Sequence, residues 1–298
     1  MVTGILNINK SVGRTSFSVV AAVKKLCRER HVGHTGTLDP MAEGVLPVCL
    51  GRATRVAEYL LDSKKTYRAV VEFGMETDTG DAEGKMISHG DVSGLNREKV
   101  LSVLGDFRGR IMQTPPMYSA LKHNGRPLYK YAREGIVIER KSRIADIFNL
   151  EILSWDTPVV VLDITCSHGT YIRSLAVDLG RTLGCGAYLK SLKRLRCGPF
   201  DISAALTLDA LEEAVQRGDW QAFLFPVDSV LQDWPVLNAG AEMADAIRHG
   251  RPVVYPEIVS GGGLSRDLCR AYSLDGSFLG VLRFNSETGE WQPKKIFL

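Results

Sequence analysis

Apolar residues recur at every second position in parts of the chain, and this pattern predicts strands. Across residues 66–73 the apolar positions share one face, while Arg68 and Glu72 take the other. Residues 4–9 and 159–166 are further apolar-rich segments of strand length. We expect all three segments to be strands.

Two other segments carry apolar residues at helical spacing. The first helix is predicted from about Ser16, after a turn at Gly13, and the second over residues 174–183. The apolar stripe of the first would comprise Phe17, Val20, Val23, Leu26 and Cys27. Because strands and helices do not alternate regularly, we expect an α+β fold on a mixed or antiparallel sheet.

The chain has 298 residues, a length that favours roughly two domains. The composition changes after Trp234-Pro235, where a helical segment (241–249) precedes strands near 267–273 and 278–284. Short strands at close spacing are typical of a small β-rich module. The predicted domains are residues 1–235 and residues 236–298.

A polar segment interrupts the first domain between about Met112 and Glu139. It holds three tyrosines and four cations: Tyr118, Tyr129, Tyr131, Lys122, Arg126, Lys130 and Arg133. Aromatic rings interleaved with cations suit nucleic acid, whose bases stack and whose phosphates need positive charge. An exposed segment without a ligand would have the same composition, so composition alone does not show whether this segment binds nucleic acid.

The net charge of +3, from 37 Lys and Arg against 34 Asp and Glu, is too small to indicate a polyanionic partner by itself. Cations do cluster in residues 24–30, 64–68, 140–143 and 190–196. Any one cluster could be a solvated face. Several clusters beside one site would indicate a polyanion more strongly.

The six cysteines form no C-x-x-C pair, and several lie in apolar runs, which indicates a reducing compartment. The amino terminus lacks the features of a signal peptide, and no stretch approaches the ~18 apolar residues of a membrane span. We therefore expect a cytoplasmic protein without membrane contact.

Cofactor motifs are absent from the sequence. It has no G-x-G-x-x-G after the first predicted strand and no Walker A lysine. His31 and His34 lie three positions apart, but no further ligands complete a zinc-like spacing. A glycoside hydrolase needs two opposed carboxylates, and Glu43 follows Asp39 too closely to face it across a sugar. We expect neither a metal nor a cofactor.

Asp39 lies before Pro40 on a turn bounded by glycines, just ahead of the apolar segment 45–50. Rigid turns often carry catalytic side chains. An Asp-Pro pair is also typical of a helix start, with Asp39 as N-cap and Pro40 as the first helical residue. Both interpretations are open from this pair alone.

Four runs together resemble the TruB family of tRNA pseudouridine synthases. They are Gly33 to Pro40, Lys65 to Ala69, Ser167 to Arg173 and Leu192 to Arg196. Their order and spacing match the family over nearly the whole chain. The chain departs from the family pattern at Ser11, where Pro is common, and at Arg55, where Lys is frequent.

The resemblance implies an isomerase that converts uridine 55 in the T loop of tRNA into pseudouridine. The reaction breaks the bond from N1 to C1′ and rejoins the uracil through C5, so it needs no cofactor. Residues 112–139 would be the family's thumb, which closes on the T arm. Residues 236–298 would be a PUA-like RNA-binding domain that contacts the acceptor end, in a protein that acts as a monomer.

The resemblance also implies the roles of two charged residues. Asp39 would attack C1′ of the ribose, or stabilise or trap charge there as uracil leaves. Attack on the base and removal of the C2′ proton are competing versions. Arg173 would pair with Asp39 and favour its ionised form; a structural salt bridge elsewhere is the alternative for this arginine.

Four uncharged residues would bind the substrate. Tyr67 would stack on the extracted base and help with the C5 proton, although a lone Tyr on an alternating strand ordinarily packs in the core. Tyr171 and Leu192 would line the same pocket. His34, at the entrance of the turn, would fill the place that the flipped nucleotide leaves.

Two other functions are compatible with these features. A non-catalytic tRNA-binding or chaperone protein would bind tRNA in a salt-dependent way without modifying it. A glycosyl-bond hydrolase would leave an abasic site and free uracil.

Overall fold

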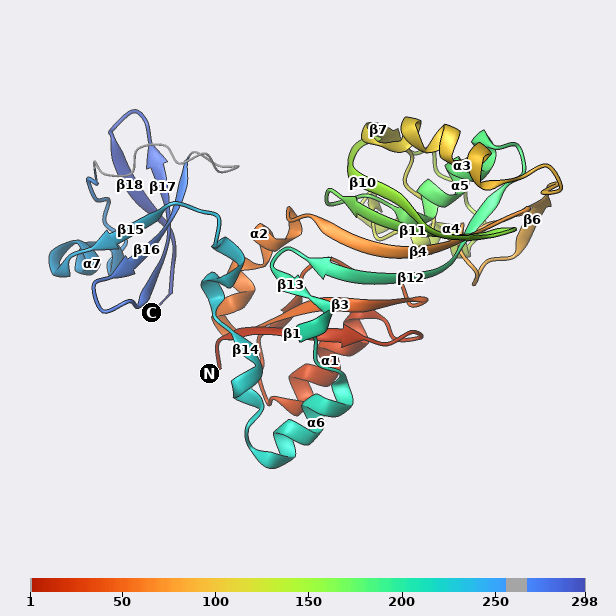
Figure 1. Ribbon diagram of the computed structural model, residues 1–298. Helices are drawn as coiled ribbons and strands as arrows, with labels where there is room; N and C mark the ends of the chain where they lie inside the picture. Colours follow the sequence, from red (N-terminus) through yellow and green to blue (C-terminus); the bar gives the residue numbers. More distant parts are fainter. Residues whose placement is uncertain (1, 256–266, 298) are drawn as a thin grey trace.

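Two sheets of unequal size organise the chain (Figure 1). The computed structural model describes residues 2–255 and 267–297. The larger sheet includes the first strand of the chain, and the smaller sheet lies in the C-terminal part (Figure 1). Helices pack beside both sheets, so the expected α+β fold is confirmed.

The larger sheet is mixed. Its strands are β1 (Gly4–Lys10), β2 (Val32–His34), β3 (Ala42–Leu50), β4 (Lys65–Phe73), β7 (Gly109–Gln113), β10 (Arg143–Asp156), β11 (Val159–Cys166), β12 (Ala187–Cys197), β13 (Phe200–Asp201) and β14 (Leu224–Phe225). Their order is β14-β1-β3-β12-β4-β11-β10-β7, with β2 beside β3 and β13 beside β12. Only the β12–β3 pair in this order is parallel.

Alternation places one face of β4 in the core, as predicted. Tyr67, Ala69, Val71 and Phe73 are buried, whereas Arg68 on the other face is exposed. Burying each large apolar side chain stabilises the fold by roughly 1.5–3 kcal/mol. β11 also coincides with the predicted strand at 159–166.

The predicted apolar stripe of α1 (Ser16–Leu26) is wrong at Phe17. That side chain is 77% exposed, while Val19 and Val23 are fully buried. Successive residues of an α-helix turn by about 100°, so Phe17 lies well away from the direction in which Ser16 and Val19 point. The strand and turn that precede α1 set which side of the helix meets the sheet.

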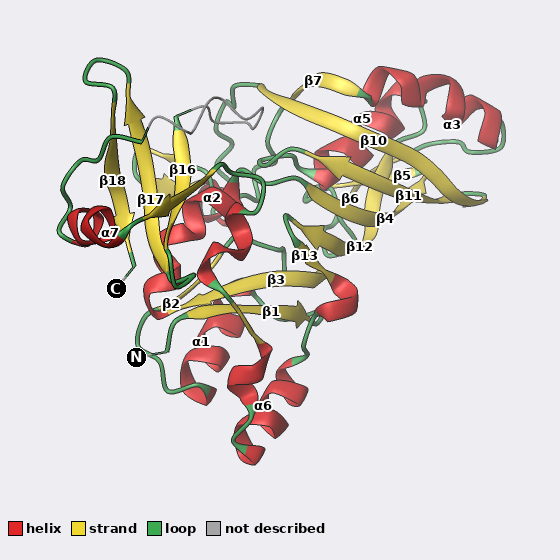
Figure 2. Ribbon diagram, turned by 60° about the vertical axis from the view of Figure 1, so that its left-hand side comes forward, coloured by secondary structure: helices red, strands yellow, loops and turns green. Residues whose placement is uncertain are grey.

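Helices lie beside two different parts of the larger sheet. The remaining ones are α2 (Ala57–Leu61), α3 (Arg97–Leu104), α4 (Leu128–Arg133), α5 (Ile172–Thr182), α6 (Leu208–Arg217) and α7 (Ala241–Arg248). In Figures 1 and 2, α1 and α6 lie beside β1 and β3, whereas α3 and α5 lie near β10 and β11. The predicted second helix corresponds to α5, which begins two residues earlier than expected.

The polar segment forms an excursion between β7 and β10. Met112 and Gln113 belong to β7, and the sheet resumes at Arg143. We call residues 114–142 the insertion. It contains a short hairpin of β8 (Lys122–His123) and β9 (Arg126–Pro127), followed by α4. A second hairpin, of β5 (Met75–Thr77) and β6 (Met86–His89), follows β4.

The smaller sheet has its own apolar core. Its strands, in order, are β15 (Val236–Ala239), β16 (Leu268–Ser273), β17 (Phe278–Asn285) and β18 (Glu290–Ile296). α7 packs on it, and Leu237, Ile247 and Trp291 are buried between them. The helix and two strands predicted here are confirmed. The domain boundary at residue 235 remains a prediction, and residues 256–266 of that domain lie outside the described residues.

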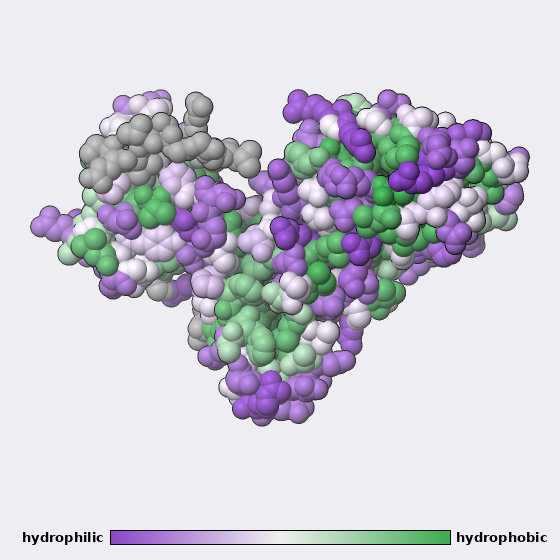
Figure 3. All heavy atoms as spheres, in the orientation of Figure 1, coloured by the Kyte–Doolittle hydropathy of each residue, from purple (hydrophilic) through white to green (hydrophobic). Residues whose placement is uncertain are grey.

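The C-terminal part meets the larger part below a notch in the molecular outline (Figure 3). Lys295 pairs with Glu58 at 2.7 Å, and Arg55 donates a hydrogen bond of 2.6 Å to the Ile296 carbonyl. The Arg55 guanidinium also lies 5.4 Å from the centre of the Phe297 ring. Arg55, at the position where the family often has Lys, therefore contacts the C-terminal part.

Candidate active site

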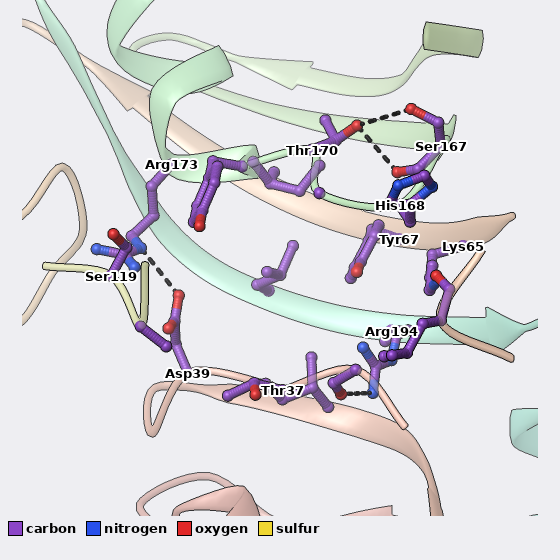
Figure 4. A pocket seen from close by; sticks show the side chains of 18 of the residues that line it. Thr37, Asp39, Lys65, Tyr67, Ser119, Ser167, His168, Thr170, Arg173 and Arg194 are labelled. Atoms are coloured by element: carbon purple, nitrogen blue, oxygen red, sulfur yellow. Dashed lines mark hydrogen bonds and ion pairs between the residues drawn. The ribbon is translucent and has the colours of Figure 1, made fainter. Parts of the chain in front are cut away.

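A cavity of about 730 Å³ opens between the larger sheet, the start of α5 and the insertion (Figure 4). Five of the six predicted site residues line it: Asp39, Tyr67, Tyr171, Arg173 and Leu192. They come from a loop, two strands and the start of one helix. Folding thus brings together residues that lie far apart in the sequence.

Asp39 lies on a turn and not at a helix start, so the helical interpretation of the Asp-Pro pair is wrong. The Ala42 N–H donates to the Asp39 carbonyl at 3.1 Å, and β3 begins directly at Ala42. The Pro40 carbonyl accepts bonds from the Gly13 N–H at 2.8 Å and from the Lys10 ammonium at 3.3 Å. Pairing of β3 with β1 decides the conformation here.

β3 and β12 approach each other closely just after this turn. Gly44 has a φ of +105°, and a Cβ atom there would lie 2.2 Å from the Arg194 carbonyl oxygen. Only glycine fits such a position. The Arg194 guanidinium donates to the carbonyls of Val45 at 2.6 Å and Gly36 at 2.9 Å. Arg194 thereby ties the loop that leads to Asp39 onto β12.

Arg173 forms an ion pair with Asp39. Its Nε lies 2.9 Å from Asp39 Oδ2 and 3.6 Å from Asp81 Oδ2. Nη1 donates to the Thr79 carbonyl at 3.1 Å, and Nη2 donates to the Tyr118 carbonyl at 2.8 Å. A guanidinium has several donors in a fixed plane, which suits this set of acceptors. The predicted contact between Arg173 and Asp39 is confirmed.

The two carboxylates beside Arg173 differ in exposure. The side chain of Asp39 is 38% exposed and lines the cavity, whereas that of Asp81 is 6% exposed. Asp81 also accepts hydrogen bonds from the Thr79 hydroxyl at 2.7 Å and from the Glu83 N–H at 3.1 Å. One cation thus serves an exposed carboxylate, Asp39, and a buried carboxylate, Asp81.

Tyr67 lies across the cavity from Asp39 (Figure 4). Burial raises the pKa of its hydroxyl to about 12, against a lowering effect of the nearby Arg194. The phenol is therefore neutral near pH 7. Its ring can offer a flat apolar surface to a base that enters the cavity.

Tyr171 and Leu192 complete the apolar lining. Tyr171 immediately precedes α5, and burial raises the pKa of its hydroxyl. Leu192, on β12, is 7% exposed. These side chains add apolar surface to a cavity that charged groups such as Lys65 and Arg194 also line, and a pocket for a small molecule or a single base combines both kinds of group.

His34 lies on the other side of the Asp39 turn. It lines an adjoining hollow of about 490 Å³, which shares Asp39 and Arg173 with the first cavity. Burial lowers the pKa of its imidazole, so the ring is neutral near pH 7. Nδ1 is buried without a hydrogen-bond partner among the described residues. His34 is thus at the entrance of the turn, as predicted, but not in the cavity that holds Tyr67.

Several polar residues of the site were not predicted from the sequence. Asp81, Arg194, Lys65 and Lys10 are each at most 5% exposed. Lys65 and Arg194 line the cavity below Tyr67, and Lys10 supports the turn that carries Asp39. Buried charges require partners, but the pattern of apolar residues does not reveal which charges are buried. The repeated Lys and Arg around β4 and β12 were the available signal.

No cluster suited to a metal ion occurs within residues 2–255 and 267–297. In the same ranges, no helix is long and apolar enough to cross a membrane.

Two family models match consecutive parts of the chain. Residues 24–172 match the N-terminal domain of TruB family pseudouridylate synthases, and residues 173–232 match the tRNA pseudouridylate synthase B C-terminal domain. The chain is 44% identical over 298 residues to tRNA pseudouridine synthase B of Pseudomonas aeruginosa. This alignment covers 99% of this chain and 96% of that protein. The chain is 43% identical over 295 residues to the Dehalococcoides mccartyi protein of the same name, with the same coverage.

Solved structures share the fold over nearly the whole chain. A chain of a Cbf5-Nop10-Gar1 complex matches with a TM-score of 0.78 and 28% identity, over 99% of this chain and 85% of that chain. A chain of an H/ACA RNP bound to a substrate RNA containing 2′-deoxyuridine matches with a TM-score of 0.76 and 25% identity, with the same coverage.

The mixed sheet and these matches together define an RNA-modifying isomerase of the pseudouridine synthase class. The chain belongs to the TruB family of tRNA pseudouridine synthases. The resemblance drawn from its four sequence runs is thereby confirmed.

Proposed function

We propose that this protein converts uridine 55 in the T loop of tRNA into pseudouridine and that Asp39 is its catalytic carboxylate. The observation that carries this proposal is the Asp39–Arg173 ion pair at the wall of a cavity that Tyr67 closes on the opposite side. Relatives at 43% and 44% identity bear the name tRNA pseudouridine synthase B.

The cavity suits one nucleotide that has left the base stack. A target base must be flipped before an enzyme can reach its glycosidic bond, and unstacking costs a few kcal/mol. The ring of Tyr67 replaces part of the lost stacking, and Tyr171 and Leu192 bury the other surfaces of the base. His34, beyond the turn, fills the space that the nucleotide leaves.

Asp39 then acts at the ribose of the flipped nucleotide. The bond from N1 to C1′ breaks, the uracil turns, a bond forms from C5 to C1′, and the C5 proton leaves as N1 gains one. Asp39 bonds to C1′, stabilises the charge that develops there, removes the C2′ proton, or attacks the base. All of these roles require an ionised carboxylate, and the Arg173 guanidinium lies 2.9 Å from that of Asp39.

Two further parts of the protein contact the RNA in this proposal. The insertion is the thumb, because it lines the cavity through Ser119 and Leu121 and carries the exposed cations Lys122, Lys130 and Arg133. Residues 236–298 form a PUA-like domain that contacts the acceptor end. The protein acts as a monomer without a cofactor.

The test is modification of a T-arm stem-loop labelled with tritium at C5 of its uridines. We expect tritium release, with pseudouridine mapped to position 55, and no release when cytidine replaces that uridine. Product at another uridine, with position 55 unchanged, would contradict the proposed specificity. Binding without release would favour an RNA-binding protein, and free uracil would indicate a hydrolase.

A further inference from the structure

Gln113 makes two hydrogen bonds to the backbone of one residue of the site. It is the last residue of β7 and is 3% exposed. Its Nε2 donates to the Tyr171 carbonyl at 2.9 Å, and its Oε1 accepts from the Tyr171 N–H at 2.7 Å. The side-chain amide thus pairs with Tyr171 as a neighbouring strand would.

Tyr171 is the residue from which α5 starts. No side chain of its own caps this helix, and the Tyr171 carbonyl also accepts the first helical hydrogen bond, from the Leu175 N–H at 3.1 Å. Arg173 follows two residues later. Holding both backbone groups of Tyr171 therefore sets the direction of its ring and the point from which the Arg173 side chain leaves the helix.

Two more hydrogen bonds join the same segments. The Ser174 hydroxyl donates to the Thr114 carbonyl at 2.9 Å, and Arg173 Nη2 donates to the Tyr118 carbonyl at 2.8 Å. Residues 113–118, where β7 passes into the insertion, thus bind residues 171–174 at three points. In the contacts with Ser174 and Arg173, residues 113–118 contribute only backbone carbonyls, which a side-chain substitution there does not remove. In the contact with Tyr171 they contribute the side chain of Gln113.

We propose that Gln113 is a positioning residue for the isomerisation. It holds the Tyr171–Arg173 segment so that Arg173 Nε stays on Asp39, and it fastens that segment to the base of the insertion. Closure of the insertion on RNA is thereby linked to the geometry of the Asp39–Arg173 pair. This inference rests on the proposed function.

A buried amide could also serve stability alone, and the two roles differ in what they change. A purely structural Gln113 would alter the free energy of unfolding but leave the rate constant of the folded protein unchanged. A positioning Gln113 sets that rate constant when RNA is saturating, with little effect on RNA affinity.

The experiment measures tritium release from the T-arm stem-loop under single-turnover conditions, with the full chain. For Gln113→Met, which has a similar shape but no hydrogen-bonding groups, we expect a rate constant lower by about tenfold or more. The RNA dissociation constant should stay within about threefold of wild type. Ser142→Ala is the matched control, because it removes an exposed hydrogen bond, to Thr114 Oγ1, at the same base of the insertion.

Gln113→Glu supplies a readout that a structural role would not move. Ionised Glu can accept from the Tyr171 N–H but cannot donate to the Tyr171 carbonyl, and burial favours its protonated form. We expect its rate, relative to wild type, to recover as the pH falls from about 8 to about 6, because the protonated acid regains the donor. If Gln113→Met does not fold, the pH dependence of the Gln113→Glu rate still tests the inference.

An unchanged rate constant for folded Gln113→Met, or a rate for Gln113→Glu that follows wild type at every pH, would overturn the inference. The activities of wild type and Ser142→Ala distinguish failure of this inference from failure of the proposed function. If both form pseudouridine while a folded Gln113 variant equals them, only the role of Gln113 fails. If wild type forms none, the proposed function fails.

Discussion

Arg173 Nε and Asp39 Oδ2 lie 2.9 Å apart, although 134 positions separate the two residues in the sequence. The same guanidinium lies beside the buried Asp81, so one cation is shared by two carboxylates. Because only Asp39 is substantially exposed, the proposed function gives Arg173 one catalytic partner, Asp39, and one structural partner, Asp81. Its removal should therefore affect both activity and stability.

Arg173→Met should lower the free energy of unfolding by about 3–5 kcal/mol, because it leaves Asp81 buried without a counter-ion. Urea unfolding at pH 7 measures this change. Arg196→Met is the control, since Arg196 pairs with Asp201 at 3.0 Å on the surface, and its loss should cost about 1 kcal/mol or less. Equal costs for the two variants would contradict the structural role of Arg173.

Two substitutions of Tyr67 test whether its ring stacks on the base. Tyr67→Phe keeps the ring, so the dissociation constant for the T-arm stem-loop should stay within about threefold of wild type. Tyr67→Leu removes the ring, and one stacked base is worth about 1–3 kcal/mol, so binding should weaken by roughly 5-fold to 150-fold. Filter binding measures both. Equal affinity of the two variants would show that Tyr67 does not stack on the base.

Lys10 predicts a pH dependence of stability. Burial lowers the pKa of its ammonium to about 8, with Asp39 raising it and Arg194 lowering it further. The pKa returns to the ordinary value of 10.5 in the unfolded chain. Between these values the unfolded chain binds more protons, so the stabilising effect of Lys10 rises with pH.

The measurement for Lys10 is the difference in free energy of unfolding between wild type and Lys10→Met. The difference should shift in favour of wild type as pH rises through that range, by at most about 1.4 kcal/mol per pH unit. Other titrating groups cancel in this difference. A difference that is independent of pH would show that Lys10 keeps its proton when the protein folds.

Arg133 tests the contact between the insertion and RNA. It is exposed, and its guanidinium lies 5.4 Å from the centre of the Tyr129 ring. Arg133→Ala should weaken T-arm binding and reduce the slope of log K against log salt by about 1, as loss of one phosphate contact does. Arg217→Ala, at the end of α6, is the control and should leave the slope unchanged. No change for Arg133→Ala would remove it from the RNA interface.

Local pattern predicted the elements whose side chains alternate between core and solvent. β4, β11 and the C-terminal strands follow from their apolar residues, because burial of one face decides their conformation. The pattern of apolar residues gave a wrong prediction where contacts between residues far apart in the sequence determine the conformation. Asp39-Pro40 has the composition of a helix start, but pairing of β3 with β1 makes it a turn.

The site was predictable in part for the same reason. Family resemblance identified Asp39, Tyr67 and Arg173, which folding places around one cavity. Asp81 and Gln113 were missed because their importance comes from burial and from backbone contacts far along the chain. A carboxylate or an amide in a polar segment carries no local sign that it will be buried.

The most direct test of the central claim is tritium release by Asp39→Asn with the T-arm stem-loop. Asparagine keeps the size of the side chain but removes the charge that every proposed route requires. We predict no release above background, with RNA binding within about threefold of wild type. Release at the wild-type rate would contradict the assignment of Asp39 as the catalytic carboxylate.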